Sequence, residues 1–403
     1  MTRDARLLFG TRVVRLFAYG FLSVVLVLYL AAIGLDERRI GLLLALTLLG
    51  DVVISFYLST RADVIGRRRT LLAGAALMVL AASVFTATGN FTLLVLAAVF
   101  GVISPSGNEV GPFLPIEQVA LAQTVSPGER TTVFAWYHLA GSFATAAGSI
   151  TAGAFAEFLQ QRGAGVVTSY RGVILLYGLL GIVLAISFLR LSEKIEPEQS
   201  DDGSSVSRSL LRVDRSRNVV LRLSALFALD SFAGGFVVQS IVAYWFYTRF
   251  GLRPAVIGAI FFGANLLGGI SALAAARIAR RIGLLNTMVF THLPSNLLLI
   301  LVPLMPNVEL AITVLLLRFS ISQMDVPTRQ SYVIAVVDPA ERSAAAGITG
   351  IARTTGAALA PLAAMPLFAS TRLQWLPFVI AGGLKVIYDL ALLRAFRKTV
   401  DAE

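Results

Sequence analysis

Residues 325–342 read DVPTRQSYVIAVVDPAER, and residues 113–130 repeat much of this stretch as FLPIEQVALAQTVSPGER. At one offset of 212 positions the two stretches share identical residues, among them Pro115 with Pro327, Gln118 with Gln330, Pro127 with Pro339, Glu129 with Glu341, and Arg130 with Arg342. This offset is about half the chain, so the sequence predicts two homologous halves in tandem. One aligned pair differs in sign, because Glu117 stands where the second half has Arg329.

The composition excludes a water-soluble globule. Of 403 residues, 57% are hydrophobic and 14% are charged, and the mean hydropathy is +0.79. Soluble proteins have about 25% charged residues, so the bilayer must be the solvent of this chain. The net charge of +11 does not indicate a nucleic-acid partner, because the basic residues lie in short loops between apolar runs. The absence of cysteine excludes disulfides, thiolate metal sites and cysteine nucleophiles.

Apolar runs of about 20 residues predict membrane-spanning helices, in which every backbone group is satisfied internally. We expect an all-α membrane protein with twelve spans, near residues 12–33, 38–58, 70–88, 92–122, 131–158, 172–190, 219–248, 255–277, 285–304, 308–337, 343–369 and 376–394.

The distribution of Lys and Arg predicts the orientation of these spans. With the N-terminus inside, the opposite side holds few basic loop residues: Arg38, Arg39, Arg162, Arg171, Arg249, Arg253 and Arg372. Both termini are therefore expected in the cytoplasm. The longest polar segment predicts a linker at 193–218, between an N-terminal six-helix bundle (1–192) and a C-terminal six-helix bundle (219–403).

The loop after the second span reads STRADVIGRRRTLL, residues 59–72, and resembles the signature of the major facilitator superfamily. Asp63, Gly66, Arg67 and Arg68 match the signature, and a weaker copy, ARIARRIGLLNTM, lies at 276–288. The resemblance covers essentially the whole chain and implies two pseudo-symmetric six-helix bundles. It also implies a secondary transporter with alternating access. We expect no enzyme and no cofactor, because His138 has no evident Ser or Cys partner and the GxxxxGK(S/T) nucleotide-binding motif is absent. The arginine motif of helix four and the proline of the antiporter motif of helix five are absent.

The same resemblance implies that Asp63 and Arg67 help to lock the halves together on the cytoplasmic side. The alternative is that the basic residues of the loop only fix orientation, and Asp63 can also cap the third helix. We add Arg130 and Arg353 to the candidate gating residues.

Charged residues inside membrane spans usually face a cavity or a partner, since burial at the bilayer centre costs at least ~2.5–3.5 kcal/mol on insertion scales. Helix ten is the densest, because the spacing of Arg318, Asp325 and Arg329 returns all three to one helical face. Pro327 should kink the helix there. We expect these three residues to bind substrate. The alternative is an internal ion-pair ladder without substrate contact.

Helix four carries SPSGNEVGPFLP at 104–115, and its prolines and glycines predict a broken helix near the bilayer midplane. A break at this depth is tolerated only beside a cavity, so Asn108 and Glu109 are candidate substrate ligands. A purely structural kink is the alternative.

Two lone mid-span acids, Asp230 and Asp51, are candidate proton carriers, because desolvation favours the neutral form of a carboxyl group. Asp230 is also a candidate substrate ligand, and either acid could instead hydrogen-bond a neighbouring helix. His138 is a further candidate for proton coupling, although a packing role is the commoner one.

Repeat symmetry could bring Glu117 and Arg329 together as a gate that a proton on Glu117 would open. Arg12 and Arg15 we expect to snorkel from the start of helix one to the cytoplasmic face.

The family resemblance favours a secondary transporter, expected to be a monomer, in which protons drive export of a small amphipathic molecule. Proton-linked uptake or facilitated movement of an organic anion is the alternative, favoured by Arg318, Arg329 and Arg353. A divalent-cation carrier or a non-transporting sensor is less favoured. The expected partners are a small molecule, protons and lipid, with no nucleic acid, metal or cofactor. We expect a multi-pass protein of a bacterial inner membrane.

Overall fold

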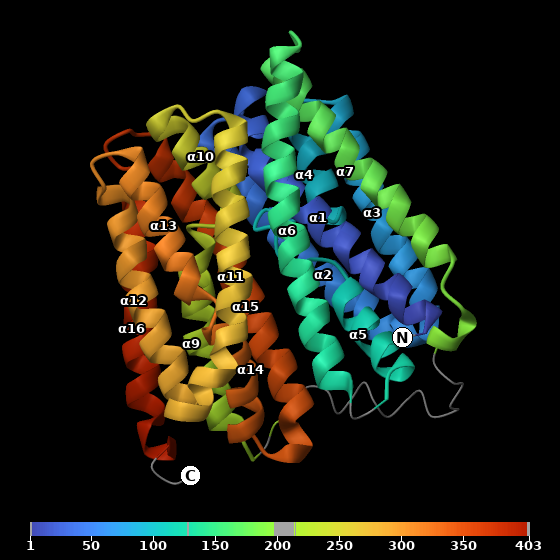
Figure 1. The fold of residues 1–403 in the computed structure, drawn as a ribbon, viewed down its shortest axis with the longest axis vertical. Coiled ribbons are helices and arrows are strands. Elements are labelled where there is room, and N and C mark those ends of the chain that lie inside the picture. The colour runs from blue at the N-terminus through green and yellow to red at the C-terminus, as the bar shows by residue number, and fades with distance from the viewer. Residues whose placement is uncertain (1, 127–128, 197–212, 214, 401–403) are drawn as a thin grey trace. The chain divides into compact units, whose positions relative to one another are not determined.

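The computed structural model describes residues 2–126, 129–196, 213 and 215–400, and the described part is helical, with no strand in it (Figure 1). The helices of the first half are α1 (Arg3–Ala32), α2 (Glu37–Ile65), α3 (Arg67–Ala87), α4 (Phe91–Phe100), α5 (Phe113–Thr124), α6 (Arg130–Gln161) and α7 (Val166–Leu189), followed by the 3-10 turn η2 (Glu193–Ile195). Those of the second half are α9 (Arg217–Gly235), α10 (Gln239–Phe250), α11 (Pro254–Ile282), α12 (Leu284–Leu301), α13 (Val308–Ser322), α14 (Asp325–Val336), α15 (Arg342–Phe368) and α16 (Leu376–Val400), with the 3-10 turns η3 (Val302–Leu304) and η4 (Pro339–Glu341).

Eleven described segments are long and apolar enough to cross a membrane, and α4 is a shorter apolar helix. The predicted fourth span is therefore made of two short helices, α4 and α5. Large hydrophobic side chains such as Val53, Leu80 and Leu175 are exposed, as expected for helices whose outer faces meet lipid. An all-helical, multi-pass membrane protein is confirmed.

The tandem repeat found in the sequence is also present in the secondary structure. Helices α5 and α14 begin at Phe113 and Asp325, and end at Thr124 and Val336. Helices α6 and α15 begin at Arg130 and Arg342. Every pair of boundaries keeps the offset that the aligned residues share, so the two halves have a common local fold in this region.

Helix four is broken, as its sequence predicts. The chain leaves helical geometry between α4 and α5, where Gly107 and Gly111 adopt φ of 73° and 79°, a conformation that favours glycine. The tenth predicted span (308–337) is broken between α13 and α14 rather than kinked at Pro327. Pro327 lies in the first turn of α14, where its missing N–H is not needed.

The seventh predicted span (219–248) is split into α9 and α10, which the sequence did not predict. The backbone N–H groups of Phe236 and Val237 form short turns to the carbonyls of Ala233 and Gly234. Gly235 lies against the backbone of α15, where a Cβ would come 2.4 Å from the carbonyl oxygen of Ala357. The break therefore serves a close helix–helix approach, and the flanking apolar residues hide it in the sequence.

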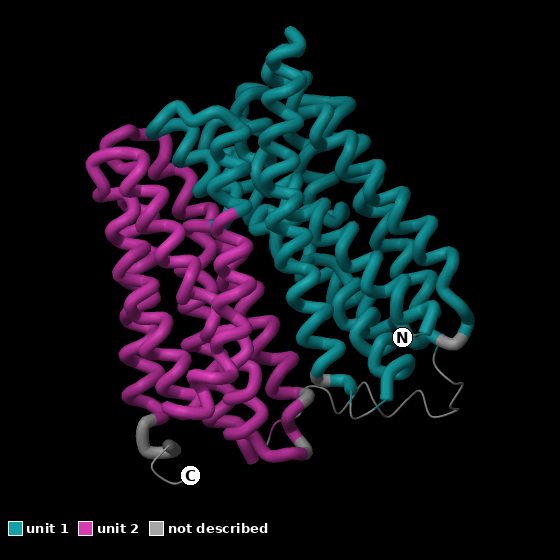
Figure 2. The backbone as a smooth tube through the Cα atoms, in the orientation of Figure 1, with its two compact units in different colours: residues 1–201, 238–262 teal, residues 202–237, 263–403 magenta. Residues whose placement is uncertain are grey.

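The chain forms two compact units, unit 1 (1–201 and 238–262) and unit 2 (202–237 and 263–403) (Figure 2). Helix α10 thus packs with the first half of the chain. Its Ser240 N–H donates to the carbonyl of Pro105 at 3.1 Å, and Gln239 Nε2 lies 2.8 Å from Ser23 Oγ. Residues 197–212 and 214, which make up most of the predicted linker, lie outside the described residues.

Unit 1 is built around α1, which is buried along most of its length. Glycines let α6 approach closely: a Cβ on Gly20 would lie 2.1 Å from the carbonyl oxygen of Thr145, and one on Gly148 would lie 2.1 Å from that of Phe17. Unit 2 has α9 at the same place in its half. Helix α9 packs against α15 and α16, with Phe227, Met288 and Tyr388 in the core.

Gly20→Ala should lower the thermal stability of the purified protein, because the added methyl group would overlap the backbone of α6. Overpacking costs about 1–3 kcal/mol. Gly10→Ala on the same helix is the control, since nothing lies within 4 Å of its Cβ position. That change should be neutral or slightly stabilising, because alanine favours helix over glycine. Equal melting temperatures for the two variants would contradict the close α1–α6 contact.

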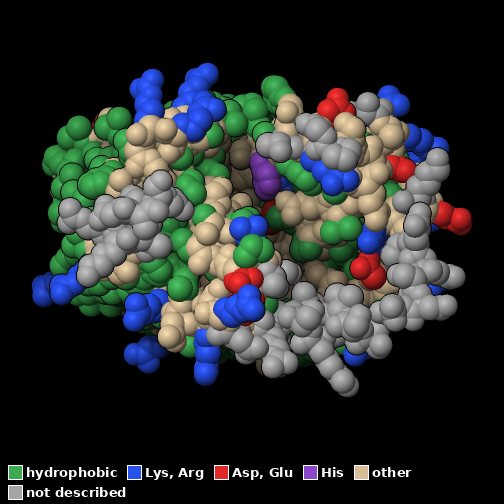
Figure 3. Space-filling view, turned by 90° about the horizontal axis from the view of Figure 1, so that it is seen from below, with side chains coloured by type: hydrophobic (Ala, Val, Ile, Leu, Met, Phe, Trp, Pro, Cys, Tyr) green, Lys and Arg blue, Asp and Glu red, His purple; other side chains and the backbone are tan. Residues whose placement is uncertain are grey.

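Charged side chains gather on the face at the bottom of Figure 1, which Figure 3 views directly. In unit 1, hydrogen bonds tie several chain segments together at one end. Asp4 Oδ1 accepts from the Ser192 N–H at 3.1 Å, and Arg67 binds the carbonyl of Ile195 at 2.9 Å. The start of α1, the α2–α3 turn and the end of α7 therefore lie at the same end of unit 1.

Candidate functional site

A buried charge cluster in unit 1 joins α1 to both sides of the helix-four break. Arg15 is fully buried, and its guanidinium NH1 and NH2 lie 2.7 and 2.6 Å from the two carboxylate oxygens of Glu117. The Arg15 Nε and NH2 groups also reach the carboxylate of Glu109, each at 3.1 Å. Thr11 and Tyr137 donate their hydroxyl groups to Glu117. Both oxygens of Glu117 are thus fully engaged.

The expectation that Arg12 and Arg15 snorkel to the surface is wrong. Arg12 is 4% exposed, and its NH1 lies 2.6 Å from Glu109 Oε1. Carboxylates from two other elements meet these arginines inside the unit, which compensates the cost of burial. Glu109 is brought to this cluster, whereas the neighbouring Asn108 is exposed.

A second buried cluster lies in unit 2 and centres on Asp230. Lys385 Nζ lies 2.6 Å from Asp230 Oδ1, and Arg329 NH1 lies 2.9 Å from Asp230 Oδ2. Arg329 NH2 is also 3.3 Å from Asp325 Oδ2. Asp230, Asp325, Arg329 and Lys385 are all less than a tenth exposed. One rung of the expected helix-ten ladder, Asp325–Arg329, therefore exists, and Asp230 joins it from α9.

The two clusters are charge-inverted copies of each other. In unit 1 the cation, Arg15, is on the first helix and the acid, Glu117, is on the helix after the break. In unit 2 the acid, Asp230, is on the first helix of its half and the cation, Arg329, is on the helix after the break. This explains why aligned positions carry opposite charges. Each of Glu117 and Arg329 is paired inside its own unit.

His292 on α12 is part of the unit 2 cluster, and the sequence reasoning missed it. It is 4% exposed, with Nδ1 2.8 Å from Asp389 Oδ1 and Nε2 3.8 Å from Asp230 Oδ1. Asn296, one turn further along α12, donates to Asp389 Oδ2 at 2.8 Å. The signal was a histidine and an asparagine four positions apart in an apolar span, which places both on one helical face.

Arg318 and Arg353 stand apart from the paired charges of unit 2. Each is half-buried and has no hydrogen bond or ion pair with a residue that the structure describes. Electrostatic interactions with Asp230 and Asp325 nevertheless reach both guanidinium groups. The expected Arg318–Asp325 rung of the ladder does not form.

The remaining expected proton carriers occupy other surroundings. Asp51 Oδ1 accepts from the backbone N–H of Gly111 at 2.6 Å and from Ser55 Oγ at 2.9 Å. Asp51 thereby supports the non-helical segment between α4 and α5. His138 is exposed, with Nδ1 3.3 Å from Arg12 NH2.

The signature loop forms a polar cluster at the end of unit 1. Arg67 Nε lies 2.8 Å from Asp63 Oδ1, and its NH1 lies 2.8 Å from Gln123 Oε1. Asp63 does not cap α3, which is a correction to the sequence-based expectation. The helix begins at Arg67, after Gly66 with φ of 102°, and Glu196 accepts the first two N–H groups. Arg130 is exposed at the start of α6.

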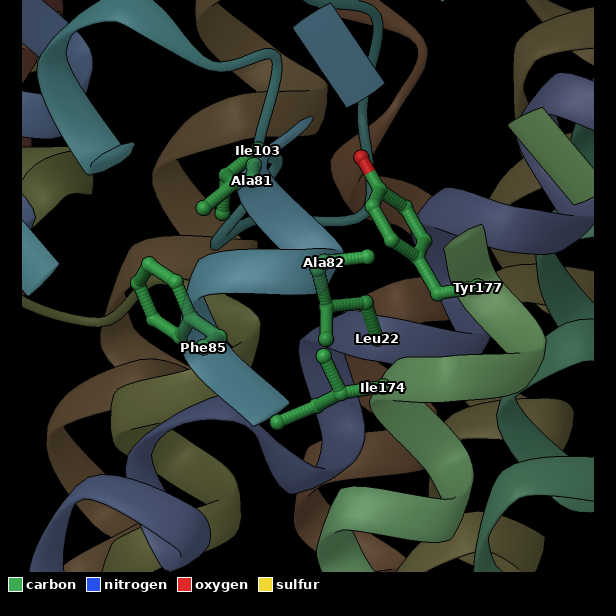
Figure 4. A pocket seen from close by; sticks show the side chains of 7 residues that line it. All are labelled: Leu22, Ala81, Ala82, Phe85, Ile103, Ile174 and Tyr177. Atoms are coloured by element: carbon green, nitrogen blue, oxygen red, sulfur yellow. The ribbon is translucent and has the colours of Figure 1, made fainter. Parts of the chain in front are cut away.

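Unit 1 also contains an apolar pocket (Figure 4). Leu22, Phe85, Ile174 and Tyr177 are among its lining residues, and the Tyr177 hydroxyl donates to the carbonyl of Val102. Nothing in this lining is charged. No group of three or more His, Asp or Glu residues in the described part of the chain is placed to hold a metal ion.

The model of the Major Facilitator Superfamily matches residues 8–361, and the chain belongs to this family of secondary transporters. The family indicates a transporter rather than an enzyme. Over 419 aligned residues, the chain is 32% identical to a Saccharomyces cerevisiae protein described as "Uncharacterized membrane protein YJR124C", with 97% of this chain and 93% of the relative covered.

Solved structures show the same fold at low sequence identity. The nucleoside transporter NupG aligns with a TM-score of 0.74 at 15% identity, over 98% of this chain and 99% of the other. A D-xylose–proton symporter aligns with a TM-score of 0.73 at 14% identity, over 96% of each chain. At this level of identity the likeness shows the fold alone.

Proposed function

We propose that this chain is a proton-coupled secondary transporter of a small organic molecule, working by alternating access. The supporting observation is the position of His292, between the carboxylates of Asp389 and Asp230 in unit 2. Histidine is the side chain that most readily changes charge between about pH 5 and 8. A buried histidine that faces two acids can therefore bind and release a proton within a membrane span.

The geometry suggests how such a proton acts on the cluster. If neutral His292 donates its Nδ1 proton to Asp389, Nε2 is the free basic nitrogen, and it faces Asp230 Oδ1 at 3.8 Å. That same oxygen is bound to Lys385 Nζ at 2.6 Å. A proton on Nε2 would place a second cation on Asp230 Oδ1 and compete with Lys385. Asn296 Nδ2, 3.2 Å from His292 Nδ1, and the edge-on ring of Tyr388 also lie close to His292.

The expected carriers Glu117 and Asp230 fit this role less well. Glu117 is bound by Arg15, Thr11 and Tyr137, and Asp230 by Lys385 and Arg329. Both carboxylates thus already have cationic partners within their own unit. We assign them the role of fixed counter-ions. Asp51, which has no cationic partner in the described part of the chain, is a second proton site in this proposal.

The gating assignment follows the family. Asp63 and Arg67, joined at 2.8 Å, would take part in gating at the end of unit 1 where α1 begins. The sequence favoured two forms of this function. One is export of an amphipathic solute in exchange for protons, and the other is proton-linked movement of an organic anion. In either form, we propose a monomer in a cell membrane with its termini in the cytoplasm.

Proteoliposomes that contain the purified chain and trapped pyranine would test this function. The probes are benzoate, uridine and tetraphenylphosphonium, which represent an anion, a neutral polar solute and a lipophilic cation. For the class that is carried, addition of probe should change the internal pH, and the sign of that change distinguishes symport from exchange.

His292→Gln is expected to reduce probe-dependent proton movement at least tenfold while exchange of labelled for unlabelled probe continues. His138→Gln, at the other histidine, is the matched control and should behave as the native chain does. Native proton movement in His292→Gln would refute the assignment of the proton site. Probe exchange by the native chain with no change in internal pH would refute proton coupling itself.

A further inference from the structure

We infer that unit 2 contains a binding site for a small organic carboxylate, formed by Arg318 on α13 and Arg353 on α15 beside the paired Arg329. This inference rests on the proposed transport function and names the class of its substrate. It depends on three observations within unit 2, namely donors without acceptors, an excess of positive charge, and repulsion between neighbouring arginines.

Several buried hydrogen-bond donors on α13–α16 of unit 2 have no acceptor among the described residues. The Nε atoms of Arg318, Arg329 and Arg353 and the hydroxyl of Tyr388 are buried and have no hydrogen-bond partner among the described residues. Tyr388 is 1% exposed and Arg329 is 5% exposed. Buried donors without partners are rare because each one costs free energy, and they call for an explanation such as an absent ligand. A ligand rich in acceptors would satisfy this set.

The charges of the cluster do not balance. Four cations, Arg318, Arg329, Arg353 and Lys385, are paired with Asp230 or Asp325 or interact with them electrostatically, against the three acids Asp230, Asp325 and Asp389. Asp389 is itself engaged by His292 and Asn296. One positive charge is therefore left over, and a ligand with one negative charge would neutralise it. Uncompensated charge in a membrane span usually marks a substrate or ion pathway.

Repulsion locates the excess charge at Arg353. Arg329 repels the Arg353 guanidinium more strongly than either Asp230 or Asp325 alone attracts it. Arg329 already has both acids as partners, at 2.9 and 3.3 Å. Arg353 and Arg318 are thus the cations that remain to meet a ligand, whereas Arg329 positions the acids.

The chemistry of these side chains favours a carboxylate. A guanidinium group is planar and presents its N–H donors in a fork that matches the two oxygens of a carboxylate. The site is not a structural ion pair, because no carboxylate of the chain lies within bonding distance of either arginine in the described residues. An amphipathic cation would meet like charge here, so the geometry disfavours that class.

Binding can be measured on the purified full-length chain in detergent, by the shift in melting temperature on adding benzoate. A ligand that binds the folded state at 100 times its dissociation constant stabilises it by about 2.7 kcal/mol. For a unit of this size that corresponds to a shift of roughly 5–10 °C. Succinate, glycerol 3-phosphate and tetraphenylphosphonium are the comparison probes, and the last should give no shift.

Arg318→Gln and Arg353→Gln should each weaken benzoate binding at least tenfold. Arg372→Gln, an exposed arginine in the loop before α16, is the matched control and should bind normally. Arg353→Gln should also raise the melting temperature of the ligand-free protein, because it removes a guanidinium that Arg329 repels. Arg353→Lys keeps the charge but loses the fork, and it should bind with intermediate affinity.

The outcomes separate this inference from the proposed function, since no pH gradient is involved. If none of the three anions shifts the melting temperature of the native chain, or if binding survives in both Gln variants, the carboxylate site is refuted while proton coupling through His292 still stands. A shift with succinate or glycerol 3-phosphate but not benzoate would overturn the single negative charge assigned to the ligand. Loss of proton coupling with benzoate binding intact would refute the proposed function alone.

Discussion

Arg15→Met is expected to destabilise the chain by about 3–5 kcal/mol, because it would leave Glu117 buried with no opposite charge. Arg15 supplies two of the hydrogen bonds to the Glu117 carboxylate, at 2.6 and 2.7 Å, and both side chains are fully buried. The remaining partners, Thr11 and Tyr137, are neutral hydroxyl groups. The melting temperature of the purified variant should fall by on the order of 10 °C.

The double variant Arg15→Met, Glu117→Met provides the control for this prediction. Replacing both members of a buried ion pair by apolar residues of similar size is often neutral or stabilising. The double variant should therefore recover most of the stability that the single variant loses. If it is as unstable as Arg15→Met alone, packing rather than the charge pair is what Arg15 contributes.

Asp230→Asn is expected to have an effect of similar size in unit 2. It would take the shared counter-ion from Lys385 and Arg329, which lie 2.6 and 2.9 Å from its two oxygens. Two buried cations would then depend on Asp325 alone, so a loss of about 3–5 kcal/mol in unfolding free energy is expected. Thermal unfolding of the purified variant measures this, and probe transport in proteoliposomes should be lost as well.

Two further variants show whether charge is the cause. Asp230→Asn combined with Lys385→Met removes one acid and one cation, and it should be more stable than Asp230→Asn alone. Asp36→Asn, at an exposed pair with Arg39 at 3.7 Å, should change stability by less than about 1 kcal/mol. An equal loss in Asp36→Asn and Asp230→Asn would contradict the special position of Asp230.

The architecture followed from local features of the sequence. Hydrophobic length alone predicts the spans, because a bilayer requires each to satisfy its own backbone. The repeat between 113–130 and 325–342 predicts equivalent helices, and α5 and α14 have boundaries that keep its offset. The break in helix four follows from the prolines and glycines of 104–115. The sequence did not predict the split between α9 and α10. Gly235 lies in an apolar run, and its close contact with Ala357 of α15 is visible only in the structure.

The candidate site was predicted as a set of residues but not as a set of contacts. Glu109, Glu117, Asp230, Asp325 and Arg329 were expected from the sequence, because charge in a span is costly and hence functional or paired. The residues that pair with them were not predicted. Arg15 looked like a surface anchor near the start of a helix, and His292 was one polar residue in an apolar run.

The sequence by itself determined a twelve-span, two-half membrane protein with a break in its fourth span, because hydropathy, proline, glycine and an internal repeat act within a helix length. Only the tertiary structure decided which charges neutralise each other. Arg15 and Glu117 are 102 positions apart, and Arg329 and Asp230 are 99 apart. Ion pairing depends on a few ångströms and on how each helix is rotated, and packing of whole helices sets both. The same packing leaves Arg318 and Arg353 without an ion pair among the residues that the structure describes.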